Sequence, residues 1–246
     1  MSKIYFASDF HLGVPNAEQS LLREKKLVRW LNEVSAEADT IYLVGDLFDF
    51  WFEYKHAVPK GYTRLLGTLS ALSDKGVRIE VFTGNHDMWM FGYLEQECGV
   101  KVHRQPIVLE AQGKKLVLGH GDGLGPGDYG YKFIKRVFAH PLSQWLFARL
   151  HPNFGIGMAN FWSRRSRATA AQKDAFKGEE HEWLLSYAKA RVQQEPDIDY
   201  FVFGHRHLPL DLTVNEHCRY VNLGDWFEAC SYAVLDQGIL ELKYYR

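Results

Sequence analysis

Residues 78–87 read RIEVFTGNHD, a short apolar run that ends in the polar segment GNHD. The run is typical of a β-strand, and the polar residues after it mark the point where that strand leaves the sheet. Ligands bind at such strand ends in open α/β sheets, so the sequence predicts a polar site there. Four further apolar runs end in the same way, in DFH (residues 9–11), GD (45–46), GHGD (119–122) and GHRH (204–207).

The spacing of apolar residues predicts the fold class. Strand-like runs at 3–8, 40–44 and 78–83 alternate with helical periodicity over 18–37 and 62–75, which favours parallel strands joined by crossover helices. Further strand-like runs lie at 115–118 and 200–203. The runs at 209–214, 219–223, 230–235 and 239–245 follow one another too closely for helices and predict hairpins. We therefore expect an α/β fold with two packed sheets and helices outside.

The composition is that of a globular protein. Of 246 residues, 46% are hydrophobic and 24% charged, with a net charge of −1, which argues against disorder. The mean hydropathy is −0.28, and no apolar run approaches the roughly 20 residues of a membrane-spanning helix. No secretory signal precedes the first strand, and three widely spaced cysteines predict reduced thiols. We expect a cytoplasmic protein.

Residues 125–180 differ from the rest of the chain. They show helical spacing with little strand character and contain nine basic and four acidic residues. This charge favours a basic helical insertion that faces an anionic group, although a solvated helix face explains it equally well. The aromatic residues of the same segment could line an apolar pocket or form the core that joins the insertion to the rest of the molecule.

The five polar segments are rich in carboxylates and imidazoles. These ligands suit divalent ions such as Mn²⁺, Fe²⁺ or Zn²⁺, and the lack of nearby thiolates argues against a structural zinc–cysteine site. Residues two apart in a strand point to the same face. We therefore expect Asp9 and His11 to point at one metal, and His205 and His207 likewise.

The order of the five segments resembles that of the calcineurin-like metallophosphoesterase superfamily, from Asp9 to His207. The resemblance implies a four-layer αββα sandwich and a two-metal site that hydrolyses phosphate esters, with Mn²⁺ expected and Fe²⁺ or Zn²⁺ as alternatives. It implies that Asp9, His11 and His207 hold one metal, that Asn85, His120 and His205 hold the other, and that Asp46 bridges the two.

The resemblance also implies a catalytic role for two residues beside the metal ligands. His86 is expected to face the phosphate and to protonate the leaving oxygen or stabilise its charge. Asp87 is expected to hold the His86 ring in the required tautomer. Asp49 and Asp122 are expected either to support the ligands from behind or to act as ordinary turn residues.

The run GDLFDFW (45–51) and the insertion after His120 resemble the UDP-2,3-diacylglucosamine hydrolases of lipid A biosynthesis. Those enzymes release UMP and a lipid monosaccharide phosphate and bind acyl chains under a helical cap. By this resemblance, residues 124–178 form the cap, and 1–123 with 179–246 form the core. The chain departs from the subgroup's G-N-R-D pattern, since it has His86 in place of arginine.

The same resemblance implies an amphiphilic nucleotide-lipid substrate and peripheral contact with the cytoplasmic leaflet of the inner membrane through residues 131–150, which are basic and apolar. The substrate-binding residues that it implies are Asn85, His86, Tyr131, Ser166, Arg167, Lys173 and Lys177.

Three alternatives remain open. The same chemistry could act on a soluble nucleotide or another phosphodiester, because the motifs give the reaction type and not the substrate. A nuclease is disfavoured by the net charge of −1 and the lack of a nucleic-acid module, so we expect no nucleic-acid partner. A non-catalytic metal-binding scaffold is disfavoured because every expected ligand is present.

Overall fold

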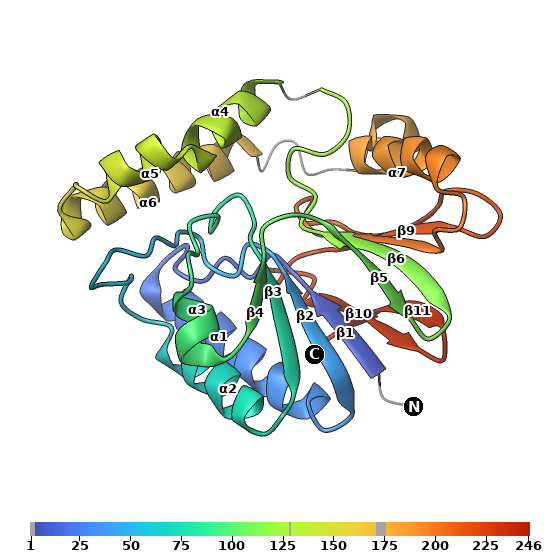
Figure 1. Cartoon of the computed structure of the whole chain (residues 1–246), viewed down its shortest axis with the longest axis horizontal. Helices are drawn as coiled ribbons and strands as arrows, with labels where there is room; N and C mark the ends of the chain where they lie inside the picture. Colours follow the sequence, from blue (N-terminus) through green and yellow to red (C-terminus); the bar gives the residue numbers. More distant parts are fainter. Residues whose placement is uncertain (1–2, 128, 171–175) are drawn as a thin grey trace.

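Two β-sheets pack face to face, with helices on their outer faces and three more helices at the top of Figure 1. The computed structural model describes residues 3–127, 129–170 and 176–246, except for the side chains of residues 164–170. The four layers confirm the predicted α/β sandwich.

The first sheet carries three of the five polar segments. Its strands are β1 (Lys3–Ala7), β2 (Ala38–Val44), β3 (Arg78–Phe82), β4 (Lys101–His103), β10 (Ser231–Asp236) and β11 (Ile239–Tyr244). Their order is β11-β10-β1-β2-β3-β4. Strands β1 to β4 pair in parallel, and β10 and β11 extend the sheet as an antiparallel hairpin beside β1.

The second sheet carries the other two polar segments. Its strands are β5 (Ile107–Ala111), β6 (Lys114–Gly119), β7 (Tyr200–Phe203), β8 (Pro209–Thr213) and β9 (Arg219–Leu223). Their order is β5-β6-β7-β9-β8, with β6, β7 and β9 parallel. The predicted strands are found in place, whereas β4 and β5 were not predicted; β4 has only three residues, too few for a periodic signal.

Helices cover the outer face of each sheet. The first sheet is covered by α1 (Ala17–Val34), α2 (Thr63–Asp74) and α3 (Tyr93–Cys98), and the second by α7 (Trp183–Gln194), which follows the short 3₁₀ helix η1 (Glu179–His181) (Figure 1). Strand alternation produces these layers. In β1, Ile4 and Phe6 pack between the sheets, and Tyr5 and Ala7 pack against the helices.

Three helices lie over the ends of the strands: α4 (Tyr129–Ala139), α5 (Pro141–Phe147) and α6 (Pro152–Ala170). We call them the cap helices. Phe147 and Ile156 pack on Phe50, Phe52 and Trp89, so part of the aromatic content of the insertion joins these helices to the body. Other large apolar side chains of the cap helices are exposed, namely Tyr129, Phe133, Ile134, Val137, Phe138, Leu142, Trp145, Leu146, Phe154, Phe161 and Trp162.

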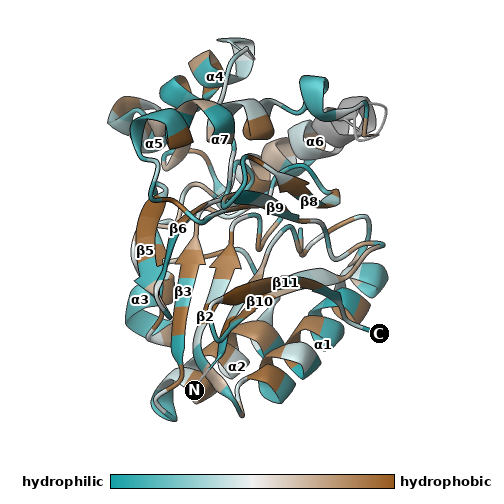
Figure 2. Cartoon of the chain, turned by 90° about the vertical axis from the view of Figure 1, so that its right-hand side faces the viewer, coloured by the Kyte–Doolittle hydropathy of each residue, from teal (hydrophilic) through white to brown (hydrophobic). Residues whose placement is uncertain are grey.

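Figure 2 shows hydrophobic residues along the strands between the layers and a mixture of hydrophobic and polar residues on the cap helices. Within the described ranges, no helix is both long and apolar enough to cross a bilayer.

The burial of the cysteines generates a chemical prediction. All three cysteines are free and buried, and burial raises the pKa of the Cys218 thiol to about 12. At pH 8 only about one such thiol in ten thousand is ionised, and the thiolate is the reactive form. We expect iodoacetamide to leave Cys218 unmodified in the native protein at pH 8 and to alkylate it in guanidinium chloride, measured by peptide mass spectrometry. Labelling of native Cys218 at the rate of the unfolded chain would contradict the prediction.

Candidate metal centre

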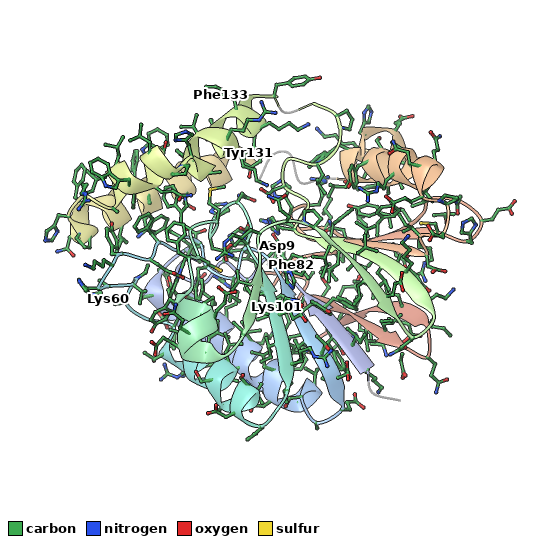
Figure 3. The ribbon with its side chains drawn as sticks, in the orientation of Figure 1. Asp9, Lys60, Phe82, Lys101, Tyr131 and Phe133 are labelled. Atoms are coloured by element: carbon green, nitrogen blue, oxygen red, sulfur yellow. The ribbon has the colours of Figure 1, made fainter. Side chains whose placement is uncertain are left out.

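The five polar segments meet at one edge of the sandwich. Asp9 and His11 follow β1, Asp46 follows β2, and Asn85 and His86 follow β3 in the first sheet. His120 follows β6, and His205 and His207 follow β7 in the second sheet. These five strands run in a common direction within their sheets, so their carboxyl ends lie together. Figure 3 shows Asp9 at this edge, beneath the cap helices.

One cluster of possible ligands is formed by Asp9, His11, Asp46 and His207, each of which offers one atom within 4.8 Å of the others. The Nε2 atoms of His11 and His207 are 3.1 Å apart, and His207 Nε2 is 3.2 Å from Asp9 Oδ1. Asp9 Oδ1 is buried and has no hydrogen-bond partner within the described part of the chain. Carboxylate oxygens and imidazole nitrogens that point at one place are the donor atoms that a divalent cation binds.

A second cluster shares one carboxylate with the first. Asp46, His120 and His205 each offer one atom within 4.8 Å of the others. Asp46 Oδ2 is 3.3 Å from His120 Nε2 and 3.5 Å from His11 Nε2, and Asn85 Oδ1 is 3.2 Å from His120 Nε2. Nitrogen and oxygen donors grouped around a shared carboxylate fit a dinuclear site for divalent ions.

The backbone corrects the expectation about strand alternation. Both strands end before their ligands begin, and Asp9, His11, His205 and His207 have φ values of 58°, 42°, 70° and 52°. Asp9 and His11 do meet in one cluster, but His205 and His207 lie in different clusters. The directions of these four side chains are therefore determined by loop residues with positive φ. The two-residue alternation of side chains along a β-strand does not apply to them.

At two motif positions only glycine fits, because a carboxylate of the clusters packs against the backbone there. A Cβ atom at Gly84 would lie 2.1 Å from Asp46 Oδ1, and one at Gly204 would lie 2.5 Å from Asp9 Oδ2. Any side chain at either position would displace a carboxylate of the clusters. The glycines in GNHD and GHRH thus have a packing role that is separate from the chemistry of their neighbours.

The buried charges of the site compensate one another. Burial opposes ionisation of Asp46, but the imidazoles of His120, His86 and His11 outweigh it and hold the pKa of this carboxyl well below the usual range. Burial also disfavours a charged His120 ring, yet the Asp46 carboxylate outweighs that effect and raises the pKa of His120 to about 10. Without a metal, a proton on His120 balances Asp46, and a divalent cation can take the place of that proton.

The pKa values of His86 and His205 shift in the opposite direction to that of His120. Burial lowers the pKa of His86 and of His205 to about 4, so both rings are neutral at pH 7. A neutral imidazole keeps one unprotonated nitrogen, which is the form that binds metals. His205 therefore suits a metal ligand.

The position of Asp87 corrects the expectation that it orients His86. Its carboxylate accepts hydrogen bonds from the backbone N–H groups of Gly84 (2.7 Å), Leu47 (2.7 Å) and Phe48 (3.2 Å). Burial and the nearby Asp46 raise the pKa of Asp87 to about 7. Asp87 ties the loop after β3 to the loop after β2, and among the described contacts none joins it to the His86 ring.

Asp49 and Ser163 surround the His86 ring instead. His86 Nδ1 is 3.1 Å from the Asp49 carbonyl oxygen and 3.1 Å from Ser163 Oγ, and Ser163 Oγ donates a 2.8 Å hydrogen bond to Asp49 Oδ2. Asp49 Oδ1 also lies 3.5 Å from His11 Nδ1. Asp49 therefore lies behind His11, at the side from which carboxylates orient metal-bound histidines. Ser163, on α6, gave no signal in the sequence, because one serine in a helix is unremarkable until the cap is folded.

On the other side of the centre, α4 contacts Asp122. Tyr131 Oη donates a 2.6 Å hydrogen bond to Asp122 Oδ2, and the Tyr131 ring is 6.3 Å from that of His205. Lys135 Nζ forms a 2.6 Å ion pair with Asp122 Oδ2. Figure 3 shows Tyr131 on the side of α4 that faces the strand ends. Asp122 thus anchors α4 next to the second cluster.

The remaining predicted cap residues are not brought to the centre by any described contact. Lys177 is exposed. The side chains of Ser166 and Arg167, and the whole of Lys173, lie outside the described residues.

A buried ion pair holds the loop that carries His205 and His207. Arg206 Nε lies 3.0 Å from Glu182 Oε2, and its guanidinium group lies 4.4 Å from the centre of the Trp183 ring. The loop is therefore fixed to the start of α7 from behind. Removal of either partner would cost the other buried charge this ion pair and would loosen the loop.

The sequence matches the model of the calcineurin-like phosphoesterase family over residues 2–209. It is 40% identical to a UDP-2,3-diacylglucosamine hydrolase of Porphyromonas gingivalis, with 98% of this chain and 97% of that protein covered. A protein of the same name from Aeromonas salmonicida is 28% identical over 97% of this chain and 91% of the relative. An archaeal phosphodiesterase structure superposes with a TM-score of 0.50 at 13% identity, with 99% of each chain covered, and shares the fold.

These matches confirm the resemblance that the order of the motifs indicated. The paired clusters supply the ligand types that a dinuclear phosphoesterase requires. The chain belongs to the calcineurin-like phosphoesterase family and is a metal-dependent hydrolase.

Proposed function

We propose that the protein hydrolyses the pyrophosphate bond of UDP-2,3-diacylglucosamine and releases UMP and a lipid monosaccharide phosphate. The observation that carries the substrate assignment is that α6, a helix with exposed Phe154, Phe161 and Trp162, also reaches the centre of the site through Ser163. An apolar helix in contact with a phosphoesterase centre suits an amphiphilic phosphate ester. The relative from Porphyromonas gingivalis, similar from end to end, supports the same substrate.

Seven residues are proposed to hold two divalent ions, with Mn²⁺ as the expected metal. When bound, the ions make hydroxide available at neutral pH and neutralise negative charge on the phosphoryl oxygens. The protein fixes the donor atoms and keeps their partners buried. Asp9, His11 and His207 are proposed for one ion, Asn85, His120 and His205 for the other, and Asp46 for both.

His86 is proposed as the acid that assists the leaving oxygen. The Asp49 carbonyl can only accept a hydrogen bond, so His86 Nδ1 carries a proton and Nε2 is the nitrogen available to substrate. Burial keeps the ring neutral at pH 7. A phosphate beside the ring favours its protonation, and the proton on Nε2 can then pass to the departing phosphate oxygen.

The substrate is proposed to lie between the cap helices and the strand ends. Tyr131, whose ring lies beside that of His205, is proposed to contact it together with Asn85 and His86. Ser166, Arg167, Lys173 and Lys177 remain proposals for the sugar-phosphate half, because no described contact bears on them. Residues 124–178 are proposed as the cap domain, and 1–123 with 179–246 as the core.

The protein is also proposed to be cytoplasmic and to associate with the cytoplasmic leaflet of the inner membrane. Phe133 and Trp145 project from the cap helices with 66% and 53% of their surface exposed, and the guanidinium group of Arg149, which follows α5, lies 4.7 Å from the centre of the Trp145 ring. Exposed rings next to basic side chains suit an anionic bilayer surface.

The proposed reaction is tested by turnover of UDP-2,3-diacylglucosamine with added Mn²⁺. We expect UMP as the nucleotide product, with activity lost on chelation of the metal. Asp46→Ala removes the carboxylate shared by both clusters and is expected to abolish turnover. His86→Ala is expected to lower kcat about a hundredfold or more, the contribution of a general acid.

A UDP-sugar and an aryl phosphodiester serve as comparison substrates. Cleavage of the aryl ester without cleavage of the lipid nucleotide would overturn the substrate assignment and leave the phosphoesterase chemistry in place. Metal content, measured in each variant, separates loss of the metal from loss of the acid.

Ser163→Ala tests whether α6 positions the acid. The change removes the hydrogen bond to the Asp49 carboxylate, and a bond to a charged group is worth about 1.5 kcal/mol, so we expect kcat to fall about tenfold with little change in KM. Ser163→Thr keeps the hydroxyl and should retain most of the activity. Ser143→Ala makes the same chemical change on α5 and should have no effect; equal losses in both alanine variants would contradict the prediction.

Sedimentation with anionic vesicles tests the membrane proposal. We expect retention at low salt, weaker retention at high salt, and about tenfold weaker binding for Phe133→Ser, since one buried aromatic ring contributes about 1.5 kcal/mol. Ile239→Ser, an equally exposed position on β11, should bind as wild type. No retention at low salt would overturn the proposal.

A further inference from the structure

A cavity of about 620 Å³ lies beside the second cluster, between α4 and the ends of β3 and β6. Its wall includes Gly84 and His120 at the metal centre and extends to Phe91, Gln105 and Gln144. A cavity of this volume is typical of small-molecule sites. None of the roles assigned so far uses the outer part of this space.

The charge of the wall indicates an anionic ligand. The described lining residues include one carboxylate, Asp122, and four cationic side chains: Arg104, Lys132, Lys135 and Arg136. The ion pair between Lys135 and Asp122 neutralises that carboxylate, and Arg104 lies 3.9 Å from Glu95, so the excess positive charge comes from Lys132 and Arg136. A phosphate uses such charge, whereas an acyl chain gains nothing from it.

The outer part of the wall offers groups that recognise a base. Phe91 is 44% exposed, and an aromatic face stacks on a nucleobase. Gln105 is exposed, and within the described part of the chain its side-chain amide forms no hydrogen bond, whereas Gln144 Nε2 already donates to the Ala139 carbonyl oxygen at 3.2 Å. A free amide presents a donor and an acceptor side by side, which complements the N3–H and carbonyl groups of uracil.

We infer that this cavity binds the uridine monophosphate half of the substrate, with the phosphate near His120 and Arg136 and the base between Phe91 and Gln105. The inference rests on the proposed function and adds the direction in which the substrate lies. The lipid half then extends to the opposite side of the centre, toward α6, where Ser163 contacts His86 and the apolar residues Phe147 and Ile156 pack on the body.

Equilibrium binding of UMP to the metal-loaded protein tests the inference, with ribose 5-phosphate as the analogue that lacks a base. We expect wild type to bind UMP more tightly than ribose 5-phosphate. Arg136→Ala removes a phosphate contact and should weaken both ligands about tenfold. Gln105→Ala removes a base contact only and should weaken UMP about fivefold while the affinity for ribose 5-phosphate stays the same.

Two exposed positions away from the cavity provide matched controls. Arg64→Ala on α2 and Gln96→Ala on α3 make the same chemical changes and should bind both ligands as wild type. Equal affinity of wild type for UMP and ribose 5-phosphate would overturn the inference. Unchanged UMP affinity in both cavity variants would also overturn it.

The binding result is separable from the proposed function. Turnover of UDP-2,3-diacylglucosamine together with unchanged UMP affinity in the variants would keep the function and reject the cavity as the uridine site. UMP binding that responds to both variants without turnover of the lipid nucleotide would keep the nucleotide site and reject the lipid substrate.

Discussion

The carboxylate of Asp46 joins the two halves of the metal centre. Its Oδ2 atom faces His11 from one cluster and His120 from the other, and its Oδ1 atom accepts the backbone N–H of His86. Its backbone carbonyl accepts hydrogen bonds from the N–H groups of Phe10 and His11. The loops after β1, β2 and β3 therefore meet at one residue, and through His120 that residue also contacts the second sheet. Since these groups are buried, loss of the carboxylate would remove the negative charge that faces the imidazoles of both clusters, and the loops of both sheets would be destabilised.

Convergence of this kind requires strained backbone. Asp9, His11, Asp46, His205 and His207 all have positive φ values, a conformation that costs a side-chain-bearing residue about 1 kcal/mol or more. Such residues persist when their surroundings determine them. Here the motif glycines leave room for the carboxylates, and the hydrogen bonds to Asp46 and Asp87 hold the loops, so the donor atoms are placed before any metal arrives.

The sequence predicted the parts of this structure that depend on local pattern. Apolar runs located most strands, and the polar segments after them located the site, because parallel strands bring their carboxyl ends to one edge. The pattern could not assign His205 and His207 to different clusters, since that depends on left-handed loop residues. It also could not show that Asp87 binds the backbone N–H groups of Leu47 and Phe48 or that Ser163 reaches His86, because those contacts join residues 39 or more positions apart in the chain. The cap boundaries and the cap lysines stay predictions.

The choice of histidine at position 86 is linked to the cap. The ring is short enough for Ser163 on α6 to contact its Nδ1 atom directly, while Ser163 also binds the Asp49 carboxylate. An arginine would be longer, would stay charged and would have no single nitrogen at which a proton can be exchanged. On the opposite side, α4 contacts Asp122 through Tyr131 and Lys135. The cap helices therefore make polar contacts on both sides of the centre. In the proposed function, a substrate seated beneath them would act directly on the carboxylates beside the proposed ligands, so that binding and chemistry would share the same few hydrogen bonds.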